Sequence, residues 1–368
     1  MNILILSCDT GGGHNTTGLA ILEELQRRGH HAVMKDPFQL SQSIFAKNVG
    51  TAYVKLVQKF PRAFGLLYHL GMMVTKLPGR SPVYYANGLM AEHMAEYLDQ
   101  HPTDVIVCPH LYPAEILTYL KRHGFPCPKS VFIATDYTCI PFTEETDCDC
   151  YVIPHKSLMQ EFIQRQIPRE KLKPLGIPVR RAFTSDMSKS EARKLLGLSE
   201  KDTYFLIAGG SIGAGSLKQF VKYLTRSLKE QEYIIVICGK NDSLRRSLEK
   251  TYRNTPKVSI LGATDQMAAY MRACDLLYSK PGGLSSTEAA VMGIPLVHIT
   301  PIPGCETCNR NFFRKKGMSV SASQIKQQAD LGRRLFEKPT TVQNMILQQK
   351  KNTSRSAAKN ICDLIESM

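Results

Sequence analysis

The sequence predicts an α/β protein with two doubly wound, Rossmann-like domains, and three observations support this fold class. The chain has 368 residues, which suits two domains of ordinary size. Short apolar runs alternate with helical stretches, and this order occurs twice along the chain, as expected for parallel sheets covered by helices. Glycine-rich turns directly follow three of the apolar runs, at the strand ends where such sheets bind ligands.

The first half opens with a predicted strand, a glycine turn and a helix, which is the usual start of a doubly wound fold. Strands are predicted at residues 2–8, 31–34, 104–108, 130–134 and 150–153. Helices are predicted at residues 16–28 and 114–122, and also within residues 41–100, where prolines interrupt them.

A second series of elements begins after PLGIP at residues 174–178, which has the composition of a linker. Its predicted strands are 204–208, 233–238, 258–261, 276–278 and 295–298. Its predicted helices are 189–196, 217–229, 243–252, 264–274 and 285–292, with helical composition again over 341–368. We therefore expect one domain over residues 1–178, a second over 179–345, and a C-terminal helix within 346–368 that packs back on the first domain.

Composition favours a protein that stays in the cytoplasm. No run reaches the roughly 18 apolar residues of a membrane-spanning helix, and the opening MNILILSCD is typical of a first strand, not of a signal peptide. The eleven cysteines are scattered. Cys148 with Cys150, and Cys305 with Cys308, would have to meet in space to make a four-thiolate zinc site, so we expect free thiols.

The formal net charge of +15 is unevenly distributed along the chain. Residues 37–91 contain no acidic side chain, and a second basic stretch covers residues 310–359. The cations of the first stretch are Lys47, Lys55, Lys59, Arg62, Lys76 and Arg80. Aromatic and aliphatic residues lie between them, which favours an anionic membrane as the partner. No nucleic-acid-binding motif is visible, and a solvated basic face is the alternative.

Two glycine-rich loops follow the first strand of each half. DTGGGH, residues 9–14, places Gly11, Gly12 and Gly13 in a turn beside an acceptor or phosphate group, and His14 at a strand end. His14 is then a general base, or it only caps the turn. The loop GGSIGAGS, residues 209–216, lacks the lysine of a P-loop. This disfavours a kinase or an ATPase but leaves backbone N–H groups for a pyrophosphate or an acceptor.

Two further motifs lie in the second half. SKPGGLSSTEAAVMGIPLV, residues 279–297, combines a strand end, a glycine turn and a helix start, which suits a pyrophosphate. Glu288 can hold ribose hydroxyls there, or it can complete a capping box with Ser285. PIPGCETCN, residues 301–309, places Glu306 and Asn309 near this motif, unless it is only a proline-rich surface loop.

Taken in order, these motifs resemble the monogalactosyldiacylglycerol synthases and the bacterial processive diacylglycerol glucosyltransferases. These are GT-B enzymes, related to the transferase that adds N-acetylglucosamine in lipid II synthesis. The resemblance spans nearly the whole chain. It rests on residues 9–14, 135–136, 209–215, 238–241 and 280–288.

The resemblance implies a GT-B fold in which two Rossmann-like domains face a central cleft. The first domain would bind the acceptor lipid and dock on the membrane through Lys55, Lys59 and Arg62, and the second would bind the UDP-sugar. His14 or Asp136 would deprotonate the acceptor hydroxyl. The residues implied for the donor are Gly210, Ser211, Gly282, Gly283, Ser285 and Ser286 for the pyrophosphate, Glu288 for the ribose, and Glu306 and Asn309 for the sugar.

The implied activity is inverting transfer of glucose or galactose from a UDP-sugar to diacylglycerol or a related lipid, at the inner face of the cell membrane. No cofactor and no obligatory metal are expected. Lys280 stands where retaining GT-B enzymes place a glutamate. The alternatives are a UDP-sugar-binding protein, a UDP-sugar epimerase of the same fold, and transfer of N-acetylglucosamine to a polyprenyl-linked acceptor. Residues 137–142 depart from the His-Pro pattern of the family, which leaves the acceptor open.

Overall fold

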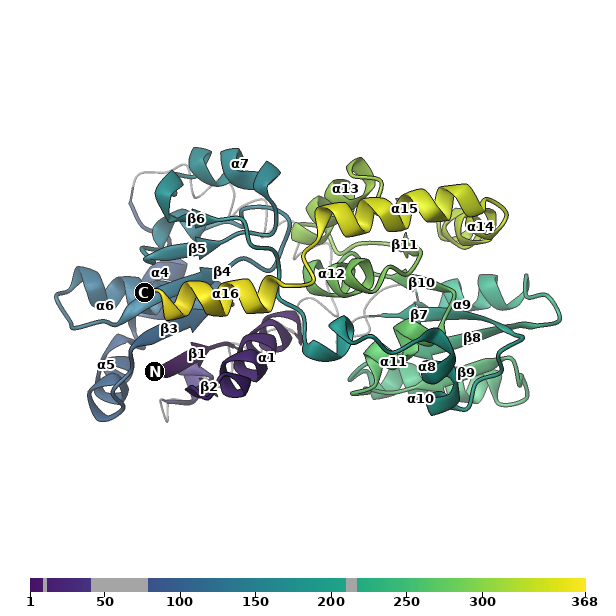
Figure 1. Ribbon diagram of the computed structural model, residues 1–368, viewed down its shortest axis with the longest axis horizontal. Helices are drawn as coiled ribbons and strands as arrows, with labels where there is room; N and C mark the ends of the chain where they lie inside the picture. The colour runs from purple at the N-terminus through teal and green to yellow at the C-terminus, as the bar shows by residue number, and fades with distance from the viewer. Residues whose placement is uncertain (9–11, 41–78, 210–216) are drawn as a thin grey trace. The chain divides into compact units, whose positions relative to one another are not determined.

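A computed structural model describes residues 1–8, 12–40, 79–209 and 217–368. The chain divides into two compact units (Figure 1). Unit 1 contains residues 1–181, 303–305 and 354–368, and unit 2 contains residues 182–302 and 306–353. The main boundary follows residue 181, three residues beyond the predicted boundary at residue 178. Both units are α/β layers around a parallel sheet, so the predicted fold class is confirmed.

The six-stranded sheet of unit 1 has the order β2-β1-β3-β4-β5-β6, and every pairing is parallel. Its strands are β1 (Asn2–Leu6), β2 (His31–Lys35), β3 (Val105–Cys108), β4 (Lys129–Ile133), β5 (Cys150–Val152) and β6 (Leu172–Lys173). Its longer helices are α1 (Gly12–Arg27), α5 (Ala91–Gln100), α6 (Leu111–Arg122) and α16 (Ala357–Glu366), with the short α4 (Pro82–Gly88) and α7 (Met159–Gln164). Short 3-10 turns, including η1 (Pro37–Gln39), complete the unit.

Unit 2 repeats this architecture, with the strand order β12-β11-β10-β7-β8-β9. Its strands are β7 (Thr203–Ala208), β8 (Glu232–Ile237), β9 (Val258–Leu261), β10 (Leu276–Ser279), β11 (Leu296–His298) and β12 (Val320–Ser321). Its helices are α8 (Lys189–Leu196), α9 (Leu217–Thr225), α10 (Asp242–Tyr252), α11 (Met267–Ala273), α12 (Gly283–Met292), α13 (Cys305–Lys315), α14 (Ile325–Phe336) and α15 (Pro339–Asn352). In both sheets the buried strands are nearly continuous apolar runs, because helices cover both faces.

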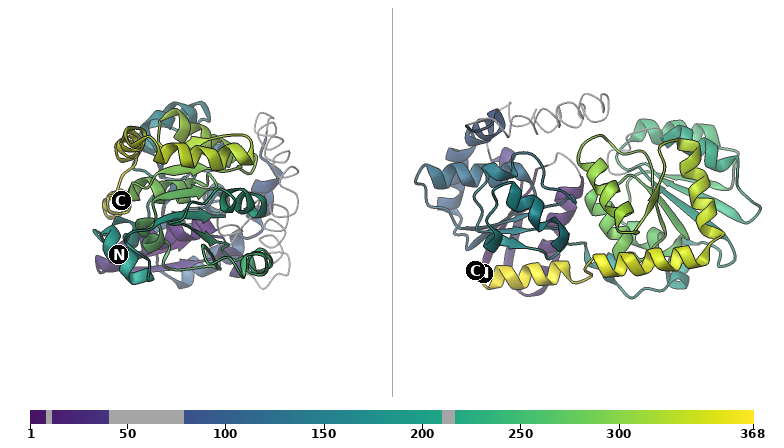
Figure 2. Two further views of the ribbon diagram at one scale, coloured as in Figure 1. Left: turned by 90° about the vertical axis from the view of Figure 1, so that its right-hand side faces the viewer. Right: turned by 90° about the horizontal axis from the view of Figure 1, so that it is seen from above.

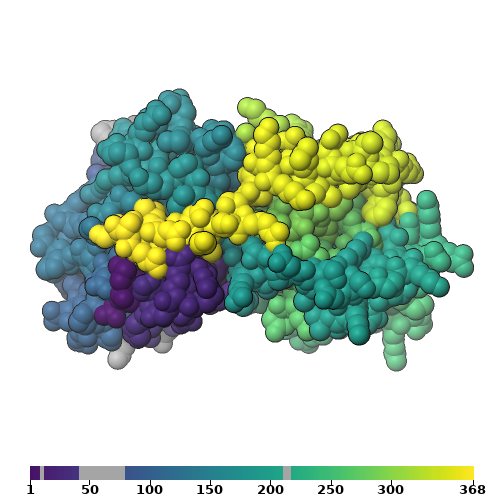
Figure 3. Space-filling model, viewed as in Figure 1, coloured from purple at the N-terminus to yellow at the C-terminus, as the bar shows by residue number. Residues whose placement is uncertain are grey.

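The core of unit 1 includes residues from both ends of the chain. Ile3 and Ile5 of β1 and Ile21 of α1 pack in one cluster with Ile361 and Ile365 of α16. Figure 3 shows α16, in yellow, lying on the surface of unit 1 over the N-terminal elements in purple, and Figure 2 shows the two termini side by side. The helical segment predicted at residues 341–368 is thus two helices, α15 in unit 2 and α16 in unit 1.

Two strands were missed by the sequence analysis, and several helix starts differ. β6 and β12 are two residues long, too short to show an apolar pattern. α1 begins at Gly12, and α12 begins at Gly283, each earlier than predicted. In the part of the chain that the structure describes, no helix combines the length and the apolarity needed to span a bilayer.

Candidate functional site

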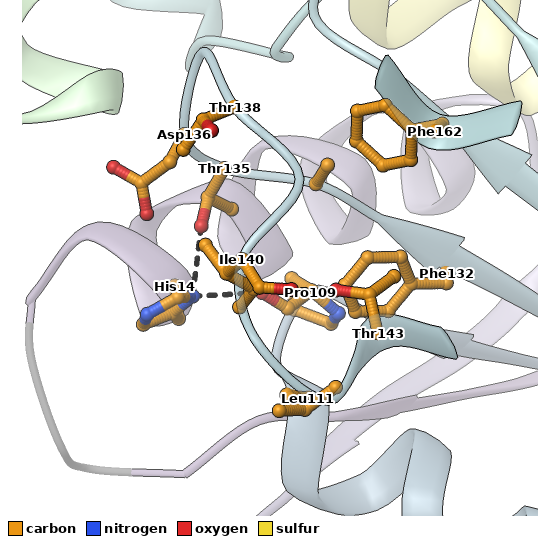
Figure 4. A pocket seen from close by; sticks show the side chains of 11 residues that line it. His14, Pro109, Leu111, Phe132, Thr135, Asp136, Thr138, Ile140, Thr143 and Phe162 are labelled. Carbon is orange, nitrogen blue, oxygen red and sulfur yellow. Dashed lines mark hydrogen bonds between the residues drawn. The ribbon is translucent and has the colours of Figure 1, made fainter. Parts of the chain in front are cut away.

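The first candidate site lies in unit 1, at the carboxyl ends of β1, β3 and β4. His14 belongs to the first turn of α1, because the helix starts at Gly12. Gly12 and Gly13 are therefore helical and not part of a turn, which corrects the prediction for these two residues. Gly11 lies outside the described residues. The ring of His14 points toward the end of β3, where Pro109 follows the strand (Figure 4).

The hydrogen bonds of His14 identify its basic nitrogen. Nδ1 lies 2.8 Å from the carbonyl oxygen of Pro109 and 3.0 Å from the hydroxyl of Thr135. A carbonyl oxygen only accepts, so Nδ1 carries the proton and donates it to Pro109. Nε2 of the neutral ring then has the free lone pair. The main chain at the end of β3 thus fixes the tautomer that a general base requires.

The protonation state of His14 reflects its surroundings. Burial lowers the pKa of His14, while the negative charge of Asp136 and the hydrogen bond to Pro109 act in the opposite direction. The ring is therefore neutral at pH 7. Asp136 follows β4, and its carboxylate lies on the His14 side of Thr135 (Figure 4). Because of its charge, Asp136 would stabilise the imidazolium that forms when His14 takes a proton.

A small cavity of about 10 Å³ lies beside His14, which is room for about one water molecule. Its wall combines main-chain turns at the strand ends with apolar side chains. The lining residues are His14, Pro109, Leu111, Phe132, Ala134, Thr135, Asp136, Thr138, Ile140, Thr143 and Phe162. The cavity is too small for a sugar or a lipid chain.

His110 is a site residue that the sequence analysis did not identify. Its ring meets the ring of His14 at a centroid distance of 4.4 Å, edge to face. Its Nδ1 accepts the N–H of Tyr112 at 3.1 Å and so caps the start of α6. Burial, together with the neighbouring His14, lowers the pKa of His110 well below its usual value. The signal was available, since His110 follows a buried strand just as His14 does.

The second candidate site lies in unit 2, at the turn from β10 to α12. The N-cap of α12 is Gly282, and no side chain caps the helix. The N–H groups of the first helical turn, at Gly283, Leu284 and Ser285, therefore have no intrahelical partner. A Cβ built at Gly282 would meet nothing within 4 Å, so the approach to these groups is open. An uncapped, open helix start of this kind suits an anion.

Three charged or polar side chains surround this turn. Lys280, largely buried, forms an ion pair with Glu306 at 3.1 Å. Glu306 also accepts the N–H of Ile302 at 2.7 Å. Asn309 is fully buried and donates to the carbonyl of Pro281 at 3.0 Å. Glu306 and Asn309 lie in the first turns of α13, not in a surface loop, and they hold Lys280 and Pro281 in the turn before α12.

The structure changes the predicted roles of several donor residues. Ser286 is fully buried, and its hydroxyl is hydrogen-bonded to Nε2 of His298 at 2.9 Å, so its side chain does not contact a pyrophosphate. Asn309 is too deeply buried to touch a sugar. Glu288 lies in the second turn of α12, and the helix begins before Ser285, which removes the capping-box alternative. Glu288 is buried, with interactions of its own.

Several predicted site residues lie outside the described part of the chain. They are Gly11 of the first loop, Gly210 and Ser211 of the second loop, and the membrane residues Lys55, Lys59 and Arg62. Among the residues that the structure does describe, no three His, Cys, Asp or Glu side chains gather as metal ligands. The expectation that no metal is required stays a prediction.

Two family models of known proteins match the chain, one in each half. A family model described as monogalactosyldiacylglycerol (MGDG) synthase matches residues 14–179, and one described as glycosyltransferase family 28 C-terminal domain matches residues 204–368. The chain is therefore similar over both halves to glycosyltransferases, and its relatives include processive diacylglycerol glucosyltransferases and monogalactosyldiacylglycerol synthases. The resemblance drawn from the motifs is therefore confirmed.

Two relatives, named for different activities, illustrate this similarity. The processive diacylglycerol beta-glucosyltransferase of Bacillus subtilis (strain 168) is 26% identical over 86% of this chain and 82% of its own length. The probable monogalactosyldiacylglycerol synthase 3, chloroplastic, of Oryza sativa subsp. japonica is 27% identical over 91% of this chain and 68% of its own length.

Solved structures of similar proteins place this chain in the GT-B fold. MurG of Acinetobacter baumannii superposes with a TM-score of 0.64 at 15% identity, covering 100% of this chain and 99% of its own. HepE of Anabaena in complex with UDP-glucose gives 0.58 at 14% identity, and covers 100% of both chains. The UDP-GlcNAc 2-epimerase of Neisseria meningitidis bound to UDP-GlcNAc gives 0.65 at 11% identity, also over 100% of both chains. At these identities the likeness concerns the fold.

Proposed function

We propose that the protein transfers a hexose from a UDP-sugar to diacylglycerol, with inversion at the anomeric carbon. The observation that carries this proposal is the geometry of His14, whose proton is held on Nδ1 by Pro109 so that Nε2 is free to act as a base. The names of the relatives support diacylglycerol as the acceptor. Structures of the same fold with UDP-glucose or UDP support the donor.

The reaction is a single displacement. Nε2 of His14 takes the proton of the acceptor hydroxyl, and the oxygen attacks the anomeric carbon as its bond to the UDP oxygen breaks. The proton ends on His14, where the Asp136 charge stabilises it, and the bonding electrons leave with UDP. Attack from the face opposite UDP converts an α-linked donor into a β-linked product.

The leaving UDP needs positive charge, and the start of α12 supplies it. The amides of Gly283, Leu284 and Ser285 would hold the diphosphate, and the helix dipole adds to the field. The ammonium group of Lys280 lies beside this turn, held there by its ion pair with Glu306. Because these groups are part of the chain, we propose that no metal is required. Glu288, one turn further along α12, would hold the ribose hydroxyls.

The residue at the end of β10 supports inversion. A retaining reaction by double displacement needs a carboxylate as the nucleophile, and Lys280 at this position is a cation that forms an ion pair. The product therefore tests the proposal. The anomeric proton of the glycolipid should show the large coupling of a β-linkage by NMR, and an α-coupling would overturn inversion.

Release of UDP tests the activity itself. The full chain is incubated with UDP-glucose or UDP-galactose and diacylglycerol, in buffer with EDTA, and UDP is measured with and without the lipid. We expect UDP only when diacylglycerol is present. A UDP-sugar epimerase would interconvert donors, and a binding protein would release no UDP. UDP-N-acetylglucosamine with a polyprenyl-linked acceptor, in place of the hexose donor and diacylglycerol, tests the remaining alternative.

The lipid acceptor also implies where the protein works. Diacylglycerol stays in the bilayer, so we propose that the protein acts as a peripheral membrane protein at the inner face of the cell membrane. The basic, apolar stretch at residues 37–91 is the proposed dock.

A further inference from the structure

Unit 2 carries a groove that the proposed chemistry does not use. It lies between α9 and α10 and has a volume of about 400 Å³. Basic, hydroxyl-bearing and apolar side chains line it. We call it the basic groove, and its lining residues are Lys218, Lys222, Thr225, Arg226, Leu248, Thr251 and Tyr252.

Two cations of the basic groove lie on α9 and the third directly follows it. Lys218 and Lys222 are four residues apart and share one face of the helix, and Arg226 is the first residue after its end. Like charges at this spacing repel one another. Residues 217–229 contain four basic residues and no acidic one, so the helix itself provides no counter-charge.

No counter-charge comes from α10 either. Its acidic residues Asp242 and Glu249 are paired with Arg245, at 3.3 and 2.9 Å. Glu232 of β8 is paired with Arg333 at 2.6 Å. Within the described ranges, Lys218, Lys222 and Arg226 take part in no ion pair. The groove is thus a concave surface with three uncompensated positive charges.

We propose that the basic groove binds the phosphate-bearing headgroups of an anionic bilayer. The three cations match phosphodiesters, which accept hydrogen bonds and carry one negative charge each. The hydroxyls of Thr225 and Thr251 donate to the carbonyls of Val221 and Ser247, so the positive charge of the cations carries the match. Tyr252 adds an aromatic ring with a polar tip, the side chain that favours the headgroup region of a membrane. The choice of a membrane over soluble phosphate rests on the proposed function, whose acceptor is a lipid.

The basic groove is separate from the proposed dock at residues 37–91, since it belongs to unit 2. A membrane contact on unit 2 would hold the donor-binding half of the enzyme at the bilayer independently of unit 1. It would also make membrane affinity depend on two groups of cations, so that loss of either weakens binding without abolishing it.

The test compares two triple variants of the full chain. K218Q/K222Q/R226Q removes the charges of the basic groove, and glutamine keeps the helix propensity of α9. R246Q/K250Q/R253Q is the matched control, because it removes three exposed cations of the same unit that do not line the groove. Co-sedimentation is measured with vesicles of phosphatidylcholine alone and with added phosphatidylglycerol. Neither donor nor acceptor is present, so the outcome does not depend on whether the protein is a transferase.

We expect the groove variant to bind phosphatidylglycerol vesicles at least about tenfold more weakly than wild type, since each cation near such a surface contributes about fivefold. The control variant should lose clearly less, and both should keep the wild-type melting temperature. Equal losses in the two variants would show an effect of net charge alone and overturn the proposal. Competition by inorganic phosphate at millimolar concentration, or binding of polyglutamate in place of vesicles, would assign the groove to a soluble anion or to an acidic protein instead.

Discussion

The carbonyl group of Pro109 decides which nitrogen of His14 can act as a base. The same peptide continues into His110, whose ring packs on that of His14. The Pro109 carbonyl and the His110 ring, both at the end of β3, therefore both contact the His14 ring. At the scale of single residues, orientation and protonation state of His14 both depend on its contacts with this turn.

Replacing His14 with alanine should lower kcat by roughly 10²–10⁴, because proton removal from the acceptor loses its base. UDP affinity should stay close to wild type, since the proposed diphosphate site is at α12. Steady-state kinetics and calorimetric UDP binding measure the two quantities. A collapse of UDP affinity with unchanged turnover on saturating donor would show that His14 has a structural role.

Replacing His110 with asparagine separates its two contacts. Asparagine is a good N-cap, so α6 should keep its start while the ring beside His14 is lost. His14 then becomes more exposed, and its lowered pKa should rise toward the usual value of about 6.5. Because the base must be unprotonated, the acid limb of kcat/KM should move to higher pH, and kcat should fall by about ten- to a hundredfold.

One control variant, His110→Ala, defines this result. His110→Ala loses the cap as well, so it should be less stable than His110→Asn by about 0.5–2 kcal/mol. An unchanged pH profile in His110→Asn, with normal folding, would mean that the His110 ring does not influence the base.

At the scale of secondary-structure elements, a buried histidine of β11 is hydrogen-bonded to α12. His298 of β11 is hydrogen-bonded to Ser286 of α12 at 2.9 Å and to Ser319 at 3.0 Å. Burial, with Arg310 adding to the effect, lowers the pKa of His298 to about 3. A hydrogen-bonded neutral imidazole thus links α12 to β11 and to the segment before β12.

The low pKa of His298 predicts a pH dependence of stability. The unfolded chain takes up a proton near pH 6.5, whereas the folded protein does not until about pH 3. The contribution is complete above pH 6.5 and is lost as the pH falls, by up to about 1.4 kcal/mol per unit. Urea unfolding followed by circular dichroism, at pH 7 and pH 5, should show this slope. His298→Gln should flatten it, and an equal slope in both proteins would contradict the assignment.

The fold could largely be predicted from the sequence, because strands and helices produce apolar patterns that repeat along the chain. The candidate site was harder to predict, because its residues lie at helix starts, which such patterns do not mark. β9 was predicted at the residues where it lies, since its apolar run is bounded by polar turns. Ser286 was misassigned because α12 begins at a glycine N-cap, without a polar capping residue to mark it. His110 was missed because a helix cap leaves no periodic pattern, and its contact with His14 joins segments far apart in the chain.

At the scale of the whole molecule, α16 is part of the core of unit 1. Ile361 and Ile365 are fully buried there, and Arg28 of unit 1 binds Asp363 and Glu366, each at 2.7 Å. Ile361→Ala should destabilise unit 1 by about 2–5 kcal/mol, measured by urea unfolding. The exposed position Lys359 is the control, since Lys359→Ala should change stability by less than about 0.5 kcal/mol. Similar effects of the two variants would contradict the role of α16 in the core.

Membrane affinity is also a property of the whole molecule. Lys55, Lys59 and Arg62, outside the described residues, lie in a stretch with six cations and no acid. Replacing all three with glutamate should release the protein from anionic vesicles, since each cation contributes about 1 kcal/mol and salt screens it over about 8 Å. Activity on short-chain, soluble diacylglycerol should survive. Unchanged sedimentation of this variant would show that the stretch is not the dock.

The return of α16 to unit 1 has a consequence for biosynthesis. A ribosome makes residues 357–366 after the whole of unit 2, yet the sheet of unit 1 packs against them. In most multidomain proteins the N-terminal domain folds first, as it emerges. Here the nascent unit 1 exposes an apolar face until unit 2 has been synthesised. During translation, unit 2 can therefore complete its fold first, and the nascent unit 1 is the part that chaperones must protect from aggregation.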